Sequence, residues 1–554
     1  MPFLYQTITV SAEEKHLDKW ELPSPKTYFL DDGSRDTIDV LQFTKNLRLD
    51  APIHQQLSHR CFNGHFQHPS SEDDSSDEMR TLHDNFLIRL ADNIGIMQAL
   101  LPTDSLRNFT WNLGCCVPFE LFGAEDYDGY LPRYQSKIQS LSLVFDRTCV
   151  QTCVEPLRVH GLHLLKELRF LSWKGTSGID DHVEYDEYAL IYRALRANSA
   201  HLQSLELEIF DSESTEWCSL DEVTGSLFEE PVRLSRLQHL SLSYLSLNSA
   251  YDNMMVPFCM EKLKSLKLRS CARIPELLEL LADWDTPLKL RSFEVVFGDD
   301  WGVNHSLRQF FGSFQGLEEI YITTPRACHI TYDKLLRVLI RCHRESLRRL
   351  ILDKSPGGGL NPEKPNPSVF HDTFRQMTLE FVAIDDSPSY LRKALGSGTD
   401  NNQIKLLHLR IHGIRQRPQD LYAELTQPGK ETGLRRDDLY GTKISMEDLS
   451  IFAEWAFGPT GLRSLMAIAY GDFTQGGRYK WSQVLLCRAS AVMSLDMETS
   501  LEPRSFRVVN PAQFHLLLDQ IEGANEMLSA CPTEHAQERW VEEDMRSQQV
   551  SENT

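Results

Sequence analysis

The chain has 554 residues, of which 41% are hydrophobic and 25% are charged, and its formal net charge is −22 at pH 7. This composition is typical of a folded protein and unlike that of a disordered chain. The acidic balance disfavours nucleic acid and anionic lipid, since binding either requires a clustered cationic surface. No apolar run approaches the ~20 residues that cross a bilayer. We therefore predict neither a nucleic-acid partner nor a membrane partner.

The sequence also bears on the compartment. Its first residues, MPFLYQTITV, lack the basic start of a secretory signal. The 12 cysteines follow no regular framework, which fits reduced thiols better than a disulfide scaffold. We expect a cytoplasmic or nuclear protein.

Residues 1–101 are predicted to be an N-terminal capping region, with strands at 5–10 and 45–49 and a helix within 82–101. The acidic stretch HPSSEDDSSDE at 68–78 has no apolar surface to offset its ordering entropy, and we expect a disordered loop there. Just before it, HRCFNGHFQH holds His59, Cys61, His65 and His68. Their spacing matches no known zinc module, so loop histidines are favoured over a metal site.

The pattern apolar-x-x-apolar-x-apolar recurs from residue 102 onward at intervals of about 26 to 37 residues. Leu237, Leu240 and Leu242 form one such copy. Each copy predicts a short strand, and helical spacing of apolar residues follows it. The first apolar positions are Leu106, Ile138, Leu165, Leu202, Leu237, Leu263, Leu290, Leu317, Leu347, Phe374 and Ile404.

A strand-helix unit repeated at this period predicts an α/β leucine-rich-repeat solenoid, or horseshoe. Because parallel crossovers are right-handed, its strands would line the concave face and its helices the convex face. We predict the array over 102–488, with loop insertions near 355–367 and 416–443. Residues 489–554 would supply a cap helix, around 513–528, and a disordered acidic tail.

Alternation along each strand sends the residues between the leucines to the concave face. These residues are polar and mixed in sign, which suits recognition of a protein, and Tyr321, Arg349 and Arg410 are of the types that most often anchor interfaces. A solvated face without a hot spot is the simpler alternative for any one of them. The predicted protein-binding residues are Glu206, Glu208, His239, Lys267, Arg269, Glu294, Glu319, Tyr321, Arg349, Asp353, His408 and Arg410; the Phe374 repeat would add Gln376 and Glu380.

Catalytic and cofactor-binding patterns are not found in the sequence. Gly357 to Gly359 lack the Gly-Lys-Ser/Thr ending of a phosphate loop, and neither a Gly-x-Ser-x-Gly elbow nor a His-Glu-x-x-His helix occurs. We therefore predict a binding protein, not an enzyme, with no cofactor and no metal.

The segment GLRSLMAIAYGDFTQGGRYKWSQVLLCRAS resembles the terminal region of fungal F-box proteins with irregular leucine-rich repeats. The matching positions are Gly471, Asp472, Phe473, Gly476, Gly477, Arg478, Tyr479, Leu485, Leu486, Cys487 and Arg488. FLYQTITV at the start also resembles the strand that follows the F-box in that group. The resemblance implies a receptor that holds targets for a cullin-RING ubiquitin ligase.

The F-box itself would stand before Phe3, where this sequence has no residues for it. A linker subunit of the ligase is thus expected as a partner only if an F-box lies upstream. Three hypotheses follow in order of preference: a target-recognition subunit, a standalone scaffold or inhibitor without ubiquitin coupling, and an enzyme.

Overall fold

In a computed structural model, the structure describes residues 6–11, 43–50, 88, 91–96, 101–113, 117–124, 127–145, 160–176, 184–210, 218–225, 232–247, 257–298, 302–325, 332–355, 367–396, 403–410, 446–474, 483–489 and 504–532. The fold divides into two compact units. Unit 1 comprises Met1–Leu263 with Glu534–Thr554, and unit 2 comprises Lys264–Thr533.

Unit 1 is built on parallel strands that follow one another in chain order. They are β1 (Thr7–Ser11), β2 (Asn46–Asp50), β3 (Asn108–Asn112), β6 (Ser140–Phe145), β7 (Phe170–Thr176), β8 (Ser204–Phe210) and β9 (His239–Ser243). The connections carry α6 (Phe119–Phe122), α7 (Tyr130–Tyr134), η2 (His160–Leu164), α8 (Glu184–Asn198), α9 (Leu220–Thr224) and η3 (Met260–Lys262). A small hairpin of β4 (Gly123–Ala124) and β5 (Tyr127–Asp128) adjoins them.

Unit 2 continues the same alternation of strand and helix. Its parallel strands are β10 (Ser265–Arg269), β11 (Ser292–Val296), β12 (Glu319–Pro325), β13 (Arg349–Ser355), β14 (Phe381–Ile384), β15 (Leu406–Arg410) and β16 (Ala467–Gly471). The repeat helices between them are α11 (Ile274–Ala282), α12 (Val303–Ser313), α13 (Tyr332–His343), α14 (Pro367–Gln376), α15 (Pro388–Leu395) and α17 (Met446–Phe457).

The C-terminal end of unit 2 does not follow the pattern of parallel strand and helix. Two antiparallel strands, β17 (Val484–Arg488) and β18 (Phe506–Val508), close its sheet. The short elements η6 (Pro511–Gln513), α18 (Phe514–Leu518) and α19 (Ala524–Ser529) follow. The single helical stretch predicted around 513–528 is thus broken, with Gly523 in the left-handed region at φ 81° just before α19.

A backbone hydrogen-bond pattern repeats at the start of the strands. The carbonyl of Lys45, the residue before β2, accepts the N–H groups of Arg107 (2.7 Å) and Asn108 (3.0 Å) of the next repeat. The same shared acceptor recurs in both units, at Gln6, Arg107, Gln139, Arg169, Gln203, Lys264, Arg291, Glu318, Arg348, Glu380 and Lys405. Because the pattern uses backbone atoms alone, it tolerates varied side chains while it fixes the stacking of repeat on repeat.

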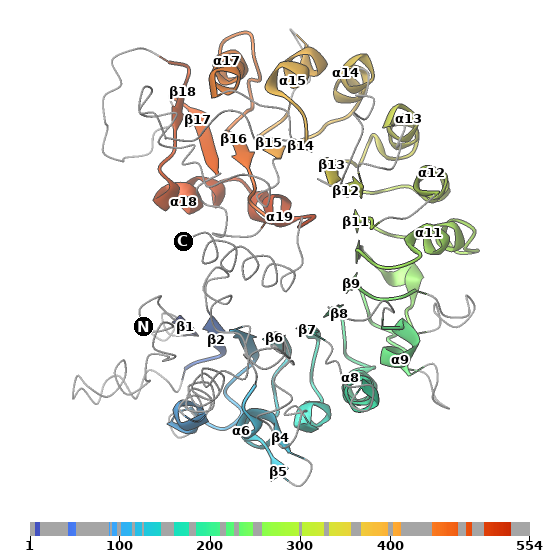
Figure 1. The fold of residues 1–554 in the computed structure, drawn as a ribbon, viewed down its shortest axis with the longest axis vertical. Helices are drawn as coiled ribbons and strands as arrows, with labels where there is room; N and C mark the ends of the chain where they lie inside the picture. The colour runs from blue at the N-terminus through green and yellow to red at the C-terminus, as the bar shows by residue number, and fades with distance from the viewer. Residues whose placement is uncertain are drawn as a thin grey trace, which may run out of the picture. The chain divides into compact units, whose positions relative to one another are not determined.

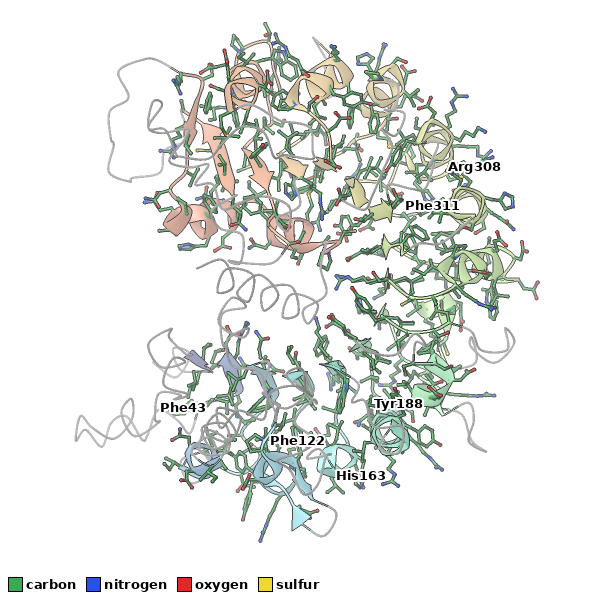
Figure 2. All side chains as sticks on the ribbon, in the orientation of Figure 1. Phe43, Phe122, His163, Tyr188, Arg308 and Phe311 are labelled. Atoms are coloured by element: carbon green, nitrogen blue, oxygen red, sulfur yellow. The ribbon has the colours of Figure 1, made fainter. Side chains whose placement is uncertain are left out.

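The core lies between the strands and the repeat helices. Figure 2 shows the two faces of α12, with Phe311 turned toward the strands and Arg308 away from them. Phe311 is fully buried and its ring lies 5.5 Å, edge-on, from that of Phe293 on β11. This is the amphipathic arrangement that the helical spacing predicts.

Polar side chains at the helix ends join neighbouring repeats through buried hydrogen bonds. The Asn198 side chain, at the end of α8, accepts the N–H of Leu168 (2.8 Å) and donates to the carbonyl of Leu165 (2.7 Å). Gln135 accepts the N–H of Leu106 in the same way (2.9 Å). At the end of α13, His343 Nδ1 accepts the N–H of Leu317 (3.4 Å). These groups satisfy N–H donors that burial would otherwise leave unpaired.

The repeat pattern holds with two corrections of register. Strand β7 has Leu171 and Trp173 in the core, so its repeat is marked by Leu168 and not by Leu165. The Phe374 copy belongs to α14, and β14 begins only at Phe381. In both cases an apolar residue of the preceding turn or helix repeats the spacing of the strand leucines, and sequence spacing alone does not separate the two.

Several predicted features fall outside the described residues. These are the acidic loop at 68–78, the His59–His68 segment, the insertion at 416–443, most of the loop at 355–367, and the tail after residue 532. The predicted domain boundaries at 101 and 488 stay predictions.

Candidate functional site

The predicted binding residues lie on the opposite face, which is the side of the strands turned away from the repeat helices. Along β10, for example, Leu266 and Leu268 are buried toward the helices, while Lys267 and Arg269 alternate with them and stay partly exposed. The strand alternation that the sequence predicts is therefore present.

In unit 2 much of the opposite face is covered by the C-terminal segment, residues 504–532. Figure 1 shows α18 and α19 on the side of the strands opposite to α14, α15 and α17. The segment packs its apolar side chains against apolar residues of the strands. The strand residues are Val296, Tyr321, Ile351, Phe381, Ala383, Leu406, Ala467, Ala469, Leu485 and Cys487, and the segment contributes Val509, Leu517, Leu518, Ile521, Ala524, Met527, Leu528, Ala530 and Cys531.

Two charged side chains of the opposite face bind the backbone near the end of this segment. Glu294 Oε1 accepts the N–H of Cys531 at 2.8 Å. Arg410 donates from Nη1 to the carbonyl of Ala530 (2.9 Å) and from Nη2 to that of Cys531 (2.6 Å). The chain bends there, with Cys531 in the left-handed region at φ 50°. We name Glu294 and Arg410 the backbone clamp.

Each clamp residue is paired along the sheet. Arg410 Nε lies 2.9 Å from Asp353 Oδ2, and both side chains are almost fully buried. Glu294 lies 2.8 Å from Arg269 Nε and 3.4 Å from Lys267 Nζ. Burial raises the pKa of Glu294, but the two cations and the hydrogen bonds from Arg269 and Cys531 outweigh burial and hold the pKa at about 2. Glu294 is therefore a carboxylate at neutral pH.

Arg349 on β13 holds the turn before α19. Its guanidinium pairs with Glu319 (2.5 Å), reaches the carbonyl of Glu522 (3.5 Å) and lies over the ring of Phe381 at 5.1 Å. A Cβ added at Gly523 would collide with this guanidinium. Arg349 also lies 3.5 Å from the exposed carboxylate of Glu526, so it has partners on the strands and in the C-terminal segment.

His408 is the only predicted binding histidine of unit 2, and it is buried. Its Nε2 pairs with the carbonyl of Gly471 at 2.9 Å, and its ring meets that of Phe473 edge-on at 5.6 Å. Burial, helped by the charge of Arg410, lowers the pKa of His408 to about 4. At neutral pH it is an uncharged packing residue.

The opposite face of unit 1 is polar. Lys174 on β7 lies 2.8 Å from Glu206 and 3.8 Å from Glu208 on β8, and the hydroxyl of Ser172 donates to Glu206 at 2.7 Å. His239 on β9 is exposed, and Glu206 is partly exposed. Charges of both signs lie here beside small hydroxyl side chains that are themselves buried, with Ser172 and Ser243 each 1% exposed.

The predicted residues therefore divide into two groups. Glu294, Asp353, His408 and Arg410 are buried and Tyr321 is 3% exposed, so the expectation that they face a partner directly is corrected for these five. Side chains with some exposure are Glu206, His239, Lys267, Arg269, Glu319 and Arg349, while Glu208 is 7% exposed. Gln376 lies at the end of α14, and Glu380 precedes β14.

The alternating pattern of the strands predicts polar residues on the opposite face, and it does not predict the apolar part of that face. The signal is present in the sequence: FVAI at 381–384 and VLLC at 484–487 are continuous apolar runs, whose buried residues point to both sides of the sheet. Such runs are typical of strands covered on both faces.

The residues of the terminal motif have structural roles. Arg488 donates to the carbonyl of Phe457 (2.5 Å), the last residue of α17, and to that of Leu462 (2.9 Å), which follows the helix. Asp472 accepts the N–H of Thr474 at 2.9 Å, and Gly471 has φ 110°. The motif thus describes how the repeat array closes; its Gly476 to Tyr479 part lies outside the described residues.

The residues that the structure describes include neither a metal-binding cluster nor a membrane-spanning helix. No group of three or more His, Cys, Asp or Glu side chains there is arranged to hold a metal ion. Within the same part of the chain, none of the helices has the length and apolar character needed to cross a membrane.

The repeats, their shared backbone acceptors and the alternation of parallel strand and helix define a leucine-rich-repeat type of α/β solenoid. No protein-family model and no curated protein matches the chain. Among solved structures, a TLR13 complex with ssRNA13 is 13% identical over 68% of this chain, with a TM-score of 0.30; the match covers 44% of the TLR13 chain. The leucine-rich-repeat protein LIC12759 of Leptospira interrogans is 10% identical over 51% of this chain and 86% of its own, with a TM-score of 0.18.

Proposed function

We propose that the protein binds other proteins through the opposite face of its strands, and that it performs no reaction itself. The observation that carries this proposal is the polar face of unit 1, where the partly exposed side chains of Lys174 and Glu206 pair across adjacent parallel strands. Within each unit we propose that the strands line a concave face, as in a leucine-rich-repeat horseshoe. Such proteins use an extended surface for recognition.

We further propose that the bound protein is a target for ubiquitin transfer in the cytoplasm or nucleus. The support is the resemblance of the terminal motif, from Gly471 to Arg488, to that of fungal F-box proteins. In this proposal the chain holds the target, while a linker subunit joins it to a cullin-RING ligase if an F-box lies upstream. A standalone scaffold or inhibitor is the alternative, supported by the repeats alone.

The proposed role is tested by following proteins that the chain captures in its native cells. A ubiquitin receptor predicts that captured proteins persist longer when the gene is deleted, and that their normal turnover returns with the wild-type chain but not with Glu206→Ala. Arg193→Ala, an exposed change on the helix side of the same unit, is the control and should restore turnover. Turnover that does not respond to deletion would remove the ubiquitin role and favour the scaffold.

A further inference from the structure

The charged strand residues under the C-terminal segment are paired without it, although the exposed Glu526 of the segment also reaches Arg349 at 3.5 Å. Arg410 pairs with Asp353, Arg269 with Glu294, and Arg349 with Glu319, all between strands of unit 2. To the clamp, the segment adds only backbone groups: the N–H of Cys531 and the carbonyls of Ala530 and Cys531. Removing the segment would therefore leave no buried charge unpaired. Leaving a buried charge without its partner is what usually makes such an opening costly.

Apart from the bonds of Arg349 to Glu522 and Glu526, the other contacts of the segment with the strands are mainly apolar. Leu517, Leu518 and Ile521 recur at helical spacing, and Met527 and Leu528 extend the apolar stripe through α19. The receiving strand residues are apolar on the opposite face as well as toward the helices. An apolar surface rimmed by polar residues is typical of a site that binds another polypeptide.

The segment has little structure of its own. Helix α18 has 5 residues, α19 has 6, and β18 has 3. Helices this short do not form alone in water, so the segment is ordered by the face on which it lies. Elements of this kind open in local transitions that cost less than unfolding the whole domain.

We propose that the C-terminal segment is a self-ligand on a polypeptide-binding surface of unit 2. A partner segment of the same chemistry binds by replacing it: a short helix with apolar residues three or four apart, followed by a bend whose N–H meets Glu294 and whose carbonyls meet Arg410. The proposal rests on the protein-binding role argued above and adds the surface, the kind of partner and the exchange.

Native-state hydrogen exchange on the unmodified chain tests the opening. The amides of Leu518, Met527 and Leu528 should exchange at least about 100-fold faster than those of Ile320 and Ile322 on β12, through an opening that depends weakly on denaturant. Equal protection and equal denaturant dependence would mean that the segment leaves only when unit 2 unfolds, and would overturn the proposal.

A labelled synthetic peptide of residues 504–532 tests the site directly. Met527→Glu places a charge on a fully buried position of α19, whereas Asn525→Glu places it on an exposed position of the same helix. The Met527→Glu chain should bind the peptide at least about 10-fold more tightly than the Asn525→Glu chain, because its own segment no longer fills the face. No binding to a Met527→Glu chain that keeps wild-type exchange in β12 contradicts the proposal.

These measurements need no natural partner. Their failure therefore leaves the proposed function of unit 1 standing, and failure of the turnover test leaves the exchange of the segment standing.

Discussion

His343 does in one repeat what Asn198 does in another. Each side chain accepts an N–H from the preceding repeat, that of Leu317 or Leu168, and each reaches a carbonyl, which for His343 Nε2 is that of Phe311 at 3.0 Å. Because Nδ1 must accept, Nε2 carries the proton and His343 is neutral. The histidine thus pairs two buried backbone groups.

This equivalence predicts the effect of two substitutions. His343→Asn should change the free energy of unfolding by less than about 1 kcal/mol at pH 7, since an amide can make the same two bonds. His343→Leu should cost about 1 to 3 kcal/mol, because it leaves a buried N–H and a buried carbonyl unpaired. Chemical unfolding at pH 7 checks both, and equal stability of the two variants would contradict the assignment.

His343 also makes the free energy of unfolding depend on pH. Burial lowers the pKa of His343 from 6.5 to about 4, so below pH 6.5 the unfolded chain takes up a proton that the native chain refuses until near pH 4. The free energy of unfolding should be unaffected above pH 6.5 and fall below it, by about 1.4 kcal/mol per pH unit for this histidine. His408 adds a similar loss. Unfolding of wild type and His343→Asn at pH 7 and pH 5 measures the difference, which should be smaller in the variant.

At the scale of elements, Arg488 on β17 ends helix α17. Its guanidinium bonds carbonyls at the helix end and lies 5.7 Å from the ring of Phe457. Arg488→Met keeps much of the apolar stem but removes these bonds, and should lower the free energy of unfolding by about 1 to 3 kcal/mol. Arg507→Met is a control, since Arg507 lies on β18 and bonds Cys487 Sγ in place of helix carbonyls. A loss no larger than that of the control would show that the motif arginine is not a helix cap.

The element scale also shows how far the sequence predicts this fold. The pattern that starts at Leu263 predicts β10, and the pattern that starts at Leu317 predicts β12. These predictions hold because every apolar residue of the two patterns is buried. The register failed at Leu165 and Phe374, where apolar residues of a neighbouring turn or helix repeat the same spacing. The covering of unit 2 was not predicted, because the Glu294–Cys531 bond joins residues far apart in the chain and no local pattern encodes it.

At the scale of the molecule, the opposite faces of the two units differ. Unit 1 offers polar side chains of both signs around Lys174, whereas unit 2 places the C-terminal segment over the strands that follow Glu294. Of the buried predicted residues, Glu294 and Arg410 bond the backbone of the segment, whereas His408 bonds the carbonyl of Gly471. Strand alternation predicts from the sequence that these side chains lie on the opposite face, but not which of them are buried, because burial depends on contacts between distant segments. Their role in binding stays a prediction.

The most direct test of the central claim is lysine cross-linking of the chain to a protein it captures in its native cells, with the linked residues read by mass spectrometry. Lys174 and Lys267 lie on the opposite face, while Lys334 and Lys393 are exposed on the repeat helices α13 and α15. Binding at the opposite face predicts that links gather on Lys174 and Lys267. Links confined to Lys334 and Lys393 would contradict it.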